Sequence, residues 1–337
     1  MVGKDLSEGF AGRKQAQKRV QQSRLIFTTC AGAGLGLLRT EHFGVVIVDE
    51  ASQLTEPATL IPLTKGCQRA VLVGDHVQLR ATVQKHAVLS AFDVSLFERL
   101  YTSADSKGVA RVMLDTQYRM HPDICAFSSV EFYDGKLKSA ESLSRVALPA
   151  SQFLWPAGAR KVFVRCSDVE DIGQQSKANS GQVRVCKQIC DLLQNESPES
   201  QPRAQNGTTT ETTTPSSSAT EIAILTPYTR QREPLQKALP KYTVSSIDGF
   251  QGREADIIIF VTTRSNPHND IGFLKDLRRL NVAMTRAKAG VIVVGNISTL
   301  IEPSDGNEEE ESKRVWRRLV QACTETRVEV PAGGDES

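Results

Sequence analysis

Two carboxylates follow directly on an apolar run in the first part of the chain. Asp49 and Glu50 stand at the end of 45–48, in the stretch VVIVDEAS. A pair of carboxylates at the end of a buried strand is costly unless a cation neutralises it. The arrangement suits metal-assisted hydrolysis, in which the first carboxylate helps to hold Mg²⁺ and the second orients or deprotonates the attacking water. The alternative is a strand that ends in an acidic turn.

Two further segments carry a polar group beside a predicted strand or helix. Gln78 lies in GDHVQL, where the apolar run 70–74 ends, and could touch a terminal phosphate. The alternative is a β-turn capped by Gly-Asp. Arg119 follows Tyr118 and precedes a helix that Pro122 is predicted to open. This arginine could be a charged finger beside an aromatic stacker, or an ion-paired surface arginine.

Two segments late in the chain could also approach a ligand. The loop 248–254, DGFQGRE, precedes an apolar run, and its glycines let the backbone come close to a bound group. The segment 277–288, LRRLNVAMTRAK, is predicted to be a helix. Arg279 and Arg286 are separated by about two helical turns, so we expect them to share a face. The alternative for this segment is a solvated basic helix.

Short apolar runs recur along the chain, with helical segments between them. The runs predicted to be strands are 25–29, 45–49, 70–74, 161–166, 221–226, 256–263 and 290–295. The segments predicted to be helices are 11–24, 56–63, 95–101, 180–194, 230–239 and 312–326. This alternation is typical of parallel sheets whose carboxyl ends line a site. It predicts an α/β protein with two domains that divide near residues 102–111.

The composition is typical of a soluble globular protein. Of its residues, 39% are hydrophobic and 24% are charged. The length of 337 residues is enough for two domains, each with its own core. The formal net charge of +2 excludes a global electrostatic footprint for nucleic acid, so any basic surface must be local. The low-complexity stretch 195–220 is predicted to be a disordered insertion, and the tail after Arg327 to be loose.

Cysteine usage and hydropathy indicate the setting. The seven cysteines are scattered, and Cys186 and Cys190 have no second pair or histidine cluster nearby. We therefore predict two apolar side chains on one helix face instead of a zinc site. No apolar run approaches the length of about 20 residues that spans a bilayer, and 1–24 is too polar for a signal peptide. We expect no membrane partner and a cytoplasmic or nuclear location.

The order of these segments resembles that of a known family. DEAS, GDHVQL, QYRMHP, DGFQGRE and RRLNVAMTRAK resemble motifs II to VI of superfamily 1 helicases. The similarity is greatest to the branch that contains the nonsense-mediated-decay helicase, senataxin and the immunoglobulin mu-binding helicase. The segment 25–34 is similar to motif Ib of that branch, and 224–231 to the motif before its second nucleic-acid-contacting helix. The resemblance covers residues 20–300 except the 195–220 insertion.

The resemblance implies a fold, an activity and partners. The fold would be two RecA-like (P-loop NTPase) domains with parallel sheets, the first incomplete, over 1–104 and 105–327, with a tail at 328–337. The activity would be hydrolysis of ATP with Mg²⁺, coupled to 5′-to-3′ movement along single-stranded RNA or DNA and to duplex unwinding. The choice between RNA and DNA stays open, because the sequence does not identify residues that would contact the 2′-hydroxyl and so distinguish RNA from DNA.

The family's nucleotide-site residues carry over onto matching positions. Asp49 would hold Mg²⁺ through water, Glu50 would position the attacking water, and Gln78 would sense the γ-phosphate. Arg119 and Arg286 would be arginine fingers that stabilise charge on the transferring phosphoryl group. The other matches are Tyr118, which would stack on the base, Gln251 and Gly252, which would lie by the phosphates, and Glu254, which would bond the ribose.

The resemblance also implies contacts to nucleic acid by residues that bear a hydroxyl group. The candidates for contacts to the phosphate backbone are Thr28, Thr29, Thr226 and Ser246. Such contacts do not depend on base sequence.

Two departures from the family pattern stand out. Arg80 and Ala81 occupy the place of two prolines after GDHVQL, which changes the stiffness of the loop and no catalytic group. The phosphate loop G-x-x-G-x-G-K-[ST] and the adenine-contacting glutamine segment do not occur, so we expect the chain to begin inside the first RecA-like domain. That loop would supply amide donors and a lysine to the phosphates, and a hydroxyl to Mg²⁺.

These observations leave competing functional hypotheses. The first is a fragment of an ATP-dependent helicase core. The second is a catalytically inactive helicase remnant that acts as a nucleic-acid- or protein-binding module, and the third is a metabolic P-loop enzyme. Matching residues at every other catalytic position favour the first over the second. The paired arginine motifs and the second RecA-like domain argue against the third.

Overall fold

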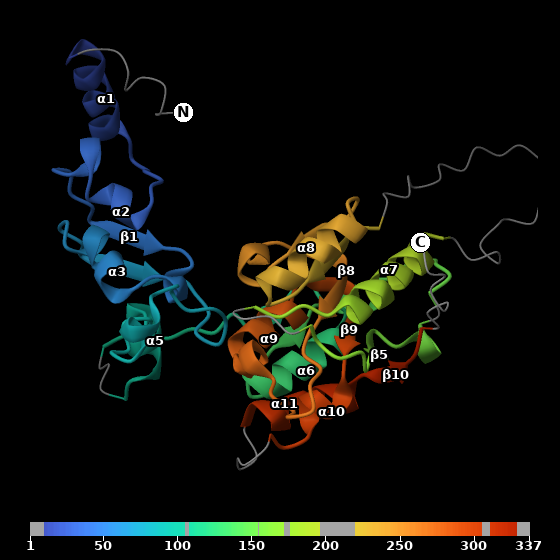
Figure 1. The fold of residues 1–337 in the computed structure, drawn as a ribbon. Helices are drawn as coiled ribbons and strands as arrows, with labels where there is room; N and C mark the ends of the chain where they lie inside the picture. The colour runs from blue at the N-terminus through green and yellow to red at the C-terminus, as the bar shows by residue number, and fades with distance from the viewer. Residues whose placement is uncertain are drawn as a thin grey trace, which may run out of the picture. The chain divides into compact units, whose positions relative to one another are not determined.

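The computed structural model describes residues 10–104, 108–153, 155–171, 176–195, 220–304 and 311–328. These residues form two compact units, the first ending at Val112 and the second beginning at Met113 (Figure 1). Each unit carries a parallel sheet of its own, so the predicted α/β class is confirmed. Most of the predicted insertion 195–220 and of the predicted tail 328–337 lies outside the described residues.

The first unit is a two-stranded parallel sheet with short helices. Its elements are α1 (Phe10–Gln22), α2 (Cys30–Ala33), η2 (Gly36–Leu38), β1 (Val45–Val48), η3 (Ala51–Gln53), α3 (Glu56–Leu63), β2 (Arg69–Leu72), α4 (Lys85–Val88) and α5 (Leu96–Thr102). β1 pairs in parallel with β2, so that Val45 lies opposite Arg69 and Val48 opposite Leu72. Both strands were predicted from their apolar runs.

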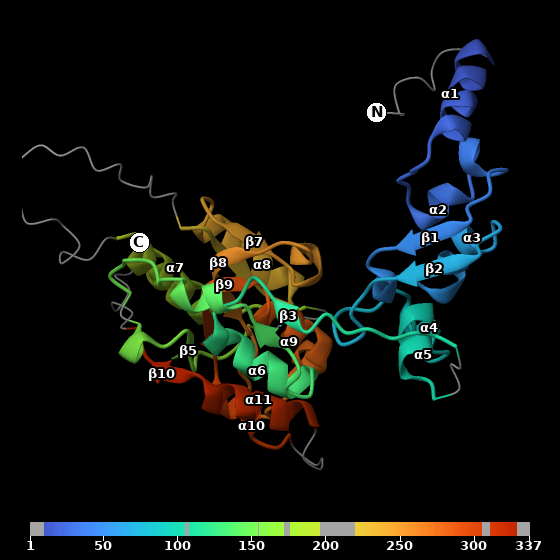
Figure 2. The same ribbon diagram turned by 180° about the vertical axis from the view of Figure 1, so that it is seen from behind.

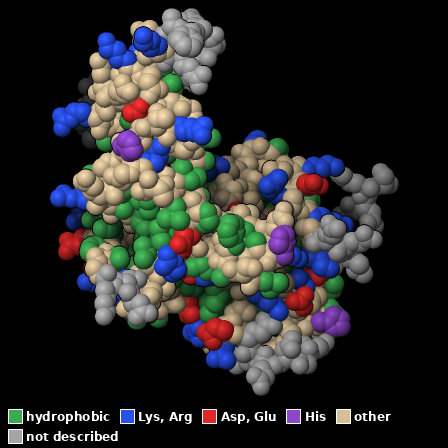
Figure 3. All heavy atoms as spheres, turned by 90° about the vertical axis from the view of Figure 1, so that its left-hand side faces the viewer, with side chains coloured by type: hydrophobic (Ala, Val, Ile, Leu, Met, Phe, Trp, Pro, Cys, Tyr) green, Lys and Arg blue, Asp and Glu red, His purple; other side chains and the backbone are tan. Residues whose placement is uncertain are grey.

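The two faces of the β1–β2 sheet differ in burial. On one face Val46, Val48 and Ala51 form a buried cluster, with Leu63 and Phe97 packed against it. The opposite face, here called the open apolar face, consists of the exposed side chains Val45, Ile47, Val71 and Val73. Figure 3 shows hydrophobic side chains gathered on this unit. Parallel sheets are ordinarily covered on both faces, so this exposure is unusual.

The predicted strand at 25–29 is wrong. These residues lie between α1 and α2 in irregular structure, and no strand of the described residues pairs with them. Leu25 and Phe27 are exposed. An apolar run becomes a strand only where a neighbouring strand supplies partners for its backbone N–H and C=O groups, and composition alone does not reveal that neighbour.

The second unit is built on a six-stranded, all-parallel sheet in the order β10-β5-β9-β8-β6-β7 (Figure 2). Its strands are β5 (Lys161–Arg165), β6 (Ile222–Leu225), β7 (Thr243–Ser245), β8 (Ala255–Val261), β9 (Ala287–Gly295) and β10 (Thr324–Thr326). A separate parallel pair is formed by β3 (Thr116–Gln117) and β4 (Lys138–Ser139).

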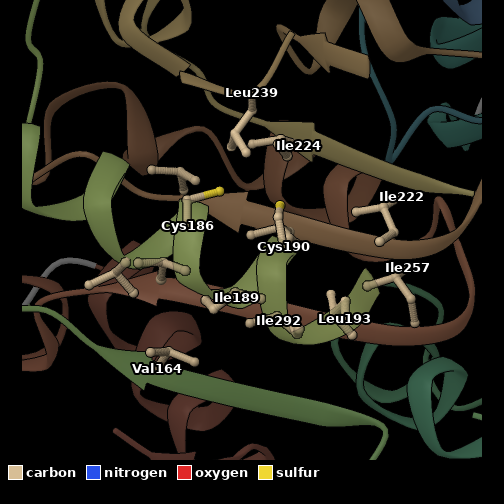
Figure 4. Close-up of a cluster of buried hydrophobic side chains, with 14 of the residues drawn as sticks. Val164, Cys186, Ile189, Cys190, Leu193, Ile222, Ile224, Leu239, Ile257 and Ile292 are labelled. Atoms are coloured by element: carbon tan, nitrogen blue, oxygen red, sulfur yellow. The ribbon is translucent and has the colours of Figure 1, made fainter. Parts of the chain in front are cut away.

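Helices cover both faces of the six-stranded sheet. They are α6 (Pro122–Phe132), α7 (Ser180–Gln194), α8 (Thr229–Ala238), α9 (Leu277–Met284), α10 (Ile297–Ile301) and α11 (Glu311–Ala322), with short 3-10 turns η4 (Glu141–Arg145), η5 (Pro156–Gly158), η7 (Asp248–Phe250) and η8 (Gly272–Lys275). On one face, α7 and α8 share a buried cluster with β5, β6, β8 and β9 (Figure 4). On the other, Phe260 of β8 stacks on Trp316 of α11, with ring centroids 6.0 Å apart. The strands read as continuous apolar runs because both faces are buried.

Two predicted boundaries in this unit are wrong. The last helix, predicted over 312–326, ends at Ala322, and Thr324–Thr326 form β10 beside β5. The helix predicted over 277–288 ends at Met284. Arg286 therefore lies in the turn before β9 and does not share a helical face with Arg279.

Cys186 and Cys190 lie on α7 inside the apolar cluster, which is the environment predicted for them (Figure 4). Within the described part of the chain, no helix combines the length and apolarity needed to cross a bilayer. The same residues include no group of three or more His, Cys, Asp or Glu side chains placed to hold a metal ion.

We expect Cys186 to resist thiol reagents while the protein is folded. A hydrogen bond with Cys190, together with complete burial, raises the pKa of the Cys186 thiol well above its ordinary value. The thiolate is the reactive form, so alkylation should wait for unfolding. Mass spectrometry after alkylation at mildly alkaline pH should find the half-buried Cys67 modified and Cys186 unmodified until denaturant is added. Rapid modification of Cys186 in the folded protein would contradict this core.

Candidate functional site

The carboxylates of the first unit are presented by a left-handed turn at the end of β1. Asp49 and Glu50 are both exposed, and Glu50 has φ +53°. The Glu50 N–H donates to Asp49 Oδ1 at 3.0 Å, and Gln53 Nε2 donates to Glu50 Oε2 at 2.7 Å. A left-handed backbone is unfavourable for a residue other than glycine and is one of the strained conformations that cluster at functional sites. The turn therefore directs two negative charges away from the strand.

The loop after β2 is bound to this acidic turn. The Asp75 N–H donates to Ser52 Oγ at 3.2 Å, and the Ala51 N–H donates to the Val73 carbonyl at 2.7 Å. Gly74 is required here, because a Cβ at this position would lie 2.8 Å from the Ser52 nitrogen. Gln78 Nε2 donates to Asp75 Oδ2 at 2.6 Å. The structure thus joins the loops that carry Asp49, Glu50 and Gln78 at one edge of the β1–β2 sheet.

Arg80, which stands where the family has proline, anchors the same loop. Its guanidinium donates to Glu98 Oε2 at 2.7 Å and to Asp93 Oδ2 at 2.9 Å, and Nη2 also contacts Glu98 Oε1. Both carboxylates are buried, and their hydrogen bonds raise the pKa of Arg80. The sequence suggested a change of stiffness only. The ion pairs were missed because Asp93 and Glu98 are distant in sequence.

Thr28 and Thr29 are exposed at the start of α2. Thr29 caps that helix, since its Oγ1 accepts the Gly32 N–H at 3.0 Å. The Thr28 hydroxyl donates to the Thr29 carbonyl at 3.3 Å. A Cβ at Gly32 would lie 2.6 Å from Thr28 Oγ1, so this turn is tightly packed.

In the second unit, three charged groups gather at the amino ends of β8 and β9. Arg119 Nε donates to Glu254 Oε2 at 2.7 Å, and Lys288 Nζ lies 3.2 Å from Glu254 Oε1. Arg119 Nη1 also donates to the Thr285 carbonyl at 3.2 Å, and the His121 N–H donates to the Lys288 carbonyl at 2.8 Å. The segment QYRMHP is thereby fixed to the start of β9. Glu254, expected at a ribose, here pairs with Arg119, expected at a phosphate.

Arg286 differs from Arg119 in its surroundings. Its side chain is only 4% exposed, and it donates to the Val282 carbonyl at 3.2 Å and to Thr285 Oγ1 at 3.1 Å. Tyr118, by contrast, is 76% exposed. Of the expected phosphate neighbours, Gln251 is half-buried and Gly252 is exposed.

Thr226 and Ser246 lie at the opposite edge of the sheet, after the carboxyl ends of β6 and β7. The Thr226 N–H donates to the Ser245 carbonyl at 3.2 Å, and Ser246 Oγ accepts the Gly249 N–H at 3.1 Å. Thr226 is 1% exposed, and its hydroxyl lies 3.1 Å from the Thr263 hydroxyl. The segment 246–254 therefore runs from the carboxyl end of β7 to the amino end of β8, and it connects the two edges.

A buried ionic network at the carboxyl edge escaped the sequence reasoning. Arg264 donates to Glu170 Oε2 at 2.8 Å, to Asp270 Oδ2 at 2.9 Å and to the Tyr228 hydroxyl at 3.4 Å. Arg264 and Glu170 are both buried. Burial raises the pKa of Tyr228, so its hydroxyl stays protonated. The signal that could have revealed the network is an arginine directly after an apolar strand, in FVTTR.

We expect removal of the Arg119 guanidinium to raise the pKa of Glu254. Arg119 holds this pKa below its ordinary value, partial burial opposes that effect, and Lys288 lowers the pKa further. A ¹³C carboxyl titration should show the Glu254 pKa rising in Arg119→Met and rising less in Lys288→Met. Arg184→Met, which removes a partner of Asp168, is the matched control and should leave Glu254 unchanged.

The linked effect on stability has a definite sign. Because the folded pKa of Glu254 is depressed, the stabilisation by this pair is present above the unfolded pKa and is lost as pH falls through the folded pKa. The pair is partly exposed, so the stabilisation should stay below about 1 kcal/mol. An unchanged Glu254 pKa in Arg119→Met would show that the pair does not form in solution.

This chain is similar in sequence to several known proteins over most of its length. A regulator of nonsense transcripts 1 homolog from Arabidopsis thaliana is 35% identical over 313 residues, which cover 86% of this chain and 23% of that protein. The ATP-dependent helicase upf1 of Schizosaccharomyces pombe is 35% identical over 323 residues, 91% of this chain and 31% of that protein. The chain thus spans less than a third of either relative. A solved complex of arterivirus nonstructural protein 10 (helicase) with DNA covers 94% of this chain and 58% of that one, at 13% identity and a TM-score of 0.40.

Family models give the assignment. Two models, each described as an AAA domain, match residues 92–298 and residues 4–86. The first of these spans more than half of the chain. The Schizosaccharomyces pombe helicase sen1, 33% identical over 305 residues, covers 86% of this chain and 17% of that protein. The chain therefore belongs to the superfamily 1 helicases, in the branch of the regulator of nonsense transcripts and senataxin.

Proposed function

We propose that this chain carries part of an ATP-dependent helicase core, which couples ATP hydrolysis to 5′-to-3′ movement along single-stranded RNA or DNA and to duplex unwinding. The acidic turn after β1 is the observation that carries the proposal. Its two exposed carboxylates sit on a strained backbone that is tied to the Gln78 loop. Relatives that bear the name ATP-dependent helicase support this reading. A cytoplasmic or nuclear location accords with it.

The carboxylates of the first unit fit a magnesium-dependent hydrolysis. Exposed carboxylate oxygens are the ligands that Mg²⁺ prefers, and Asp49 would hold the ion through water. The ion would neutralise charge on the phosphates when bound. Glu50 would orient the attacking water and accept its proton, while Gln78 would donate to the terminal phosphate.

Two arginines of the second unit would supply positive charge to the proposed hydrolysis. Arg119 would exchange its partner Glu254 for a phosphate oxygen, and Arg286 would act beside it after release from its backbone contacts. Glu254, once released, would bond the ribose. The exposed Tyr118 would stack on the base, and Gln251 and Gly252 would lie by the phosphates.

The nucleic-acid contacts of the proposal fall at other positions. Thr28 and Thr29 are exposed, so their hydroxyls are accessible to a phosphate of the strand. Ser246 would contribute at the carboxyl edge of the second sheet. Thr226 would have to turn from Thr263 toward solvent, or act through its neighbours.

The full chain should hydrolyse ATP faster when single-stranded RNA or DNA is added. A steep rise in turnover with added strand would support the motor. Salt-sensitive strand binding without any turnover would instead favour the non-catalytic remnant. Turnover that ignores the strand would contradict both and favour a small-molecule P-loop enzyme.

Glu50→Gln should abolish most of the strand-stimulated turnover. The substitution keeps the size of the side chain but removes the proton acceptor, and loss of such a group costs about 10²- to 10⁴-fold in rate. Glu56→Gln is the matched control, because Glu56 lies on the same unit and only pairs with Arg99 at the surface. Steady-state phosphate release measures both variants. Equal turnover of Glu50→Gln and the wild type would remove Glu50 from the mechanism.

A further inference from the structure

Phe273 is a large aromatic side chain held partly in solvent at the carboxyl edge of the second sheet. It lies in η8, which follows the loop after β8, and is 53% exposed. Ile271 and Leu274 on either side of it are buried, so the turn itself is packed against the unit. The turn thus presents the phenylalanine ring to solvent from a packed base.

The backbone of this turn is fixed by Tyr228. The Phe273 N–H donates to the Tyr228 hydroxyl at 3.1 Å, and that hydroxyl is 3.3 Å from the Ile271 carbonyl. The rings of Tyr228 and Phe273 are 5.4 Å apart and tilted by 50°. Gly272, at φ +51°, lies so close that a Cβ would be 2.2 Å from Arg264 Nη1. The position of the Phe273 ring is therefore well defined.

The support beneath the turn is an ionic network around the buried pair Arg264 and Glu170. Arg264 binds Glu170, Asp270 and the Tyr228 hydroxyl, and Asp270 Oδ1 accepts the Gly272 N–H at 3.0 Å. Burying such charges does not by itself favour folding over apolar packing. What the network achieves here is a rigid base under a half-exposed ring. Preorganised aromatic side chains of this kind bind with little loss of conformational entropy.

Tyr228, whose ring contacts Phe273, adjoins the residues proposed to meet the nucleic-acid backbone. The Tyr228 N–H is 3.4 Å from Thr226 Oγ1, and the Thr226 N–H donates to the carbonyl of Ser245, which precedes Ser246. Exposed cations stand on the two elements involved, Arg230 in α8 and Lys275 in η8. Single-strand binding sites combine such basic groups with aromatic faces on which bases stack.

We propose that Phe273 is a stacking platform for one base of single-stranded RNA or DNA, held in place by Tyr228 and the Arg264 network. This inference rests on the proposed function and adds a specific base contact to it. Every base presents a π-face, so the platform accepts any sequence. It supplies apolar contact area to a site whose other members are hydroxyls and cations.

The test uses the full chain and two fluorescent strands of equal length, one with bases and one made of abasic sites. Phe273→Ala should weaken anisotropy-measured binding of the base-bearing strand by on the order of ten-fold, the usual effect of losing one stacked base. Binding of the abasic strand should not change. The slope of log affinity against log salt should also stay the same, because no phosphate contact is lost.

Matched variants separate stacking from simple packing. Phe273→Trp should retain affinity, whereas Phe273→Leu, which keeps apolar bulk but lacks a π-face, should weaken the base-bearing strand as Ala does. Val130→Ala removes another exposed apolar side chain, from α6, and should change nothing. The melting temperatures of all variants show whether the unit remains folded.

Three results would overturn the inference without contradicting the proposed function. They are unchanged affinity in Phe273→Ala, equally weakened binding of both strands in Phe273→Ala, and full affinity in Phe273→Leu. The first would mean that no base reaches the ring, the second that the turn acts through its fold, and the third that apolar contact suffices. A wild-type chain that binds neither strand would instead contradict the proposed function itself.

Discussion

All six strands of the second sheet run in one direction, and the placement of its candidate site residues follows from that constraint. Parallel strands bring their amino ends to one edge and their carboxyl ends to the other. Arg119, Glu254 and Lys288 accordingly meet at the amino edge, while Thr226 and Ser246 lie at the carboxyl edge. The segment 246–254 is the covalent link between these edges, so one short piece of backbone carries candidate residues to both of them.

The two proposed arginine fingers of this unit, Arg119 and Arg286, are held in place by contacts of different strength. Arg119 is in a partly exposed ion pair, which contributes at most about 1 kcal/mol, so the proposed exchange of Glu254 for a phosphate would have little cost. Lys288 would then still neutralise the Glu254 carboxylate. Arg286 is buried and bonded to backbone and hydroxyl oxygens, and leaving them unsatisfied costs about 1–3 kcal/mol for each group. Engagement of Arg286 therefore requires a local rearrangement that Arg119 does not need.

Much of the fold was legible in the sequence, because strands buried on both faces appear as unbroken apolar runs. β8 and β9 were found in this way, and the acidic turn was placed by the strand before it. Contacts between polar residues that are distant in sequence could not be predicted. The hydropathy pattern gives no sign that Arg80 pairs with Glu98 or that Arg264 pairs with Glu170. The run at 25–29 misled because strand formation depends on a neighbour. Arg286 was put on a helix face because the helix end at Met284 carries no glycine or proline signal.

The open apolar face has a thermodynamic consequence for the first unit. A two-stranded sheet is marginally stable alone. The side chains of this face stay in contact with water, so they contribute no free energy of hydrophobic burial to the folded unit. Amide hydrogens of β1 and β2 are thus positioned to exchange far sooner than those of β8 and β9, through opening events of low free energy. Any binder that covers this face would stabilise the unit by mass action. A bound partner on the open apolar face would therefore also lengthen the time for which β1, the strand before Asp49 and Glu50, stays folded.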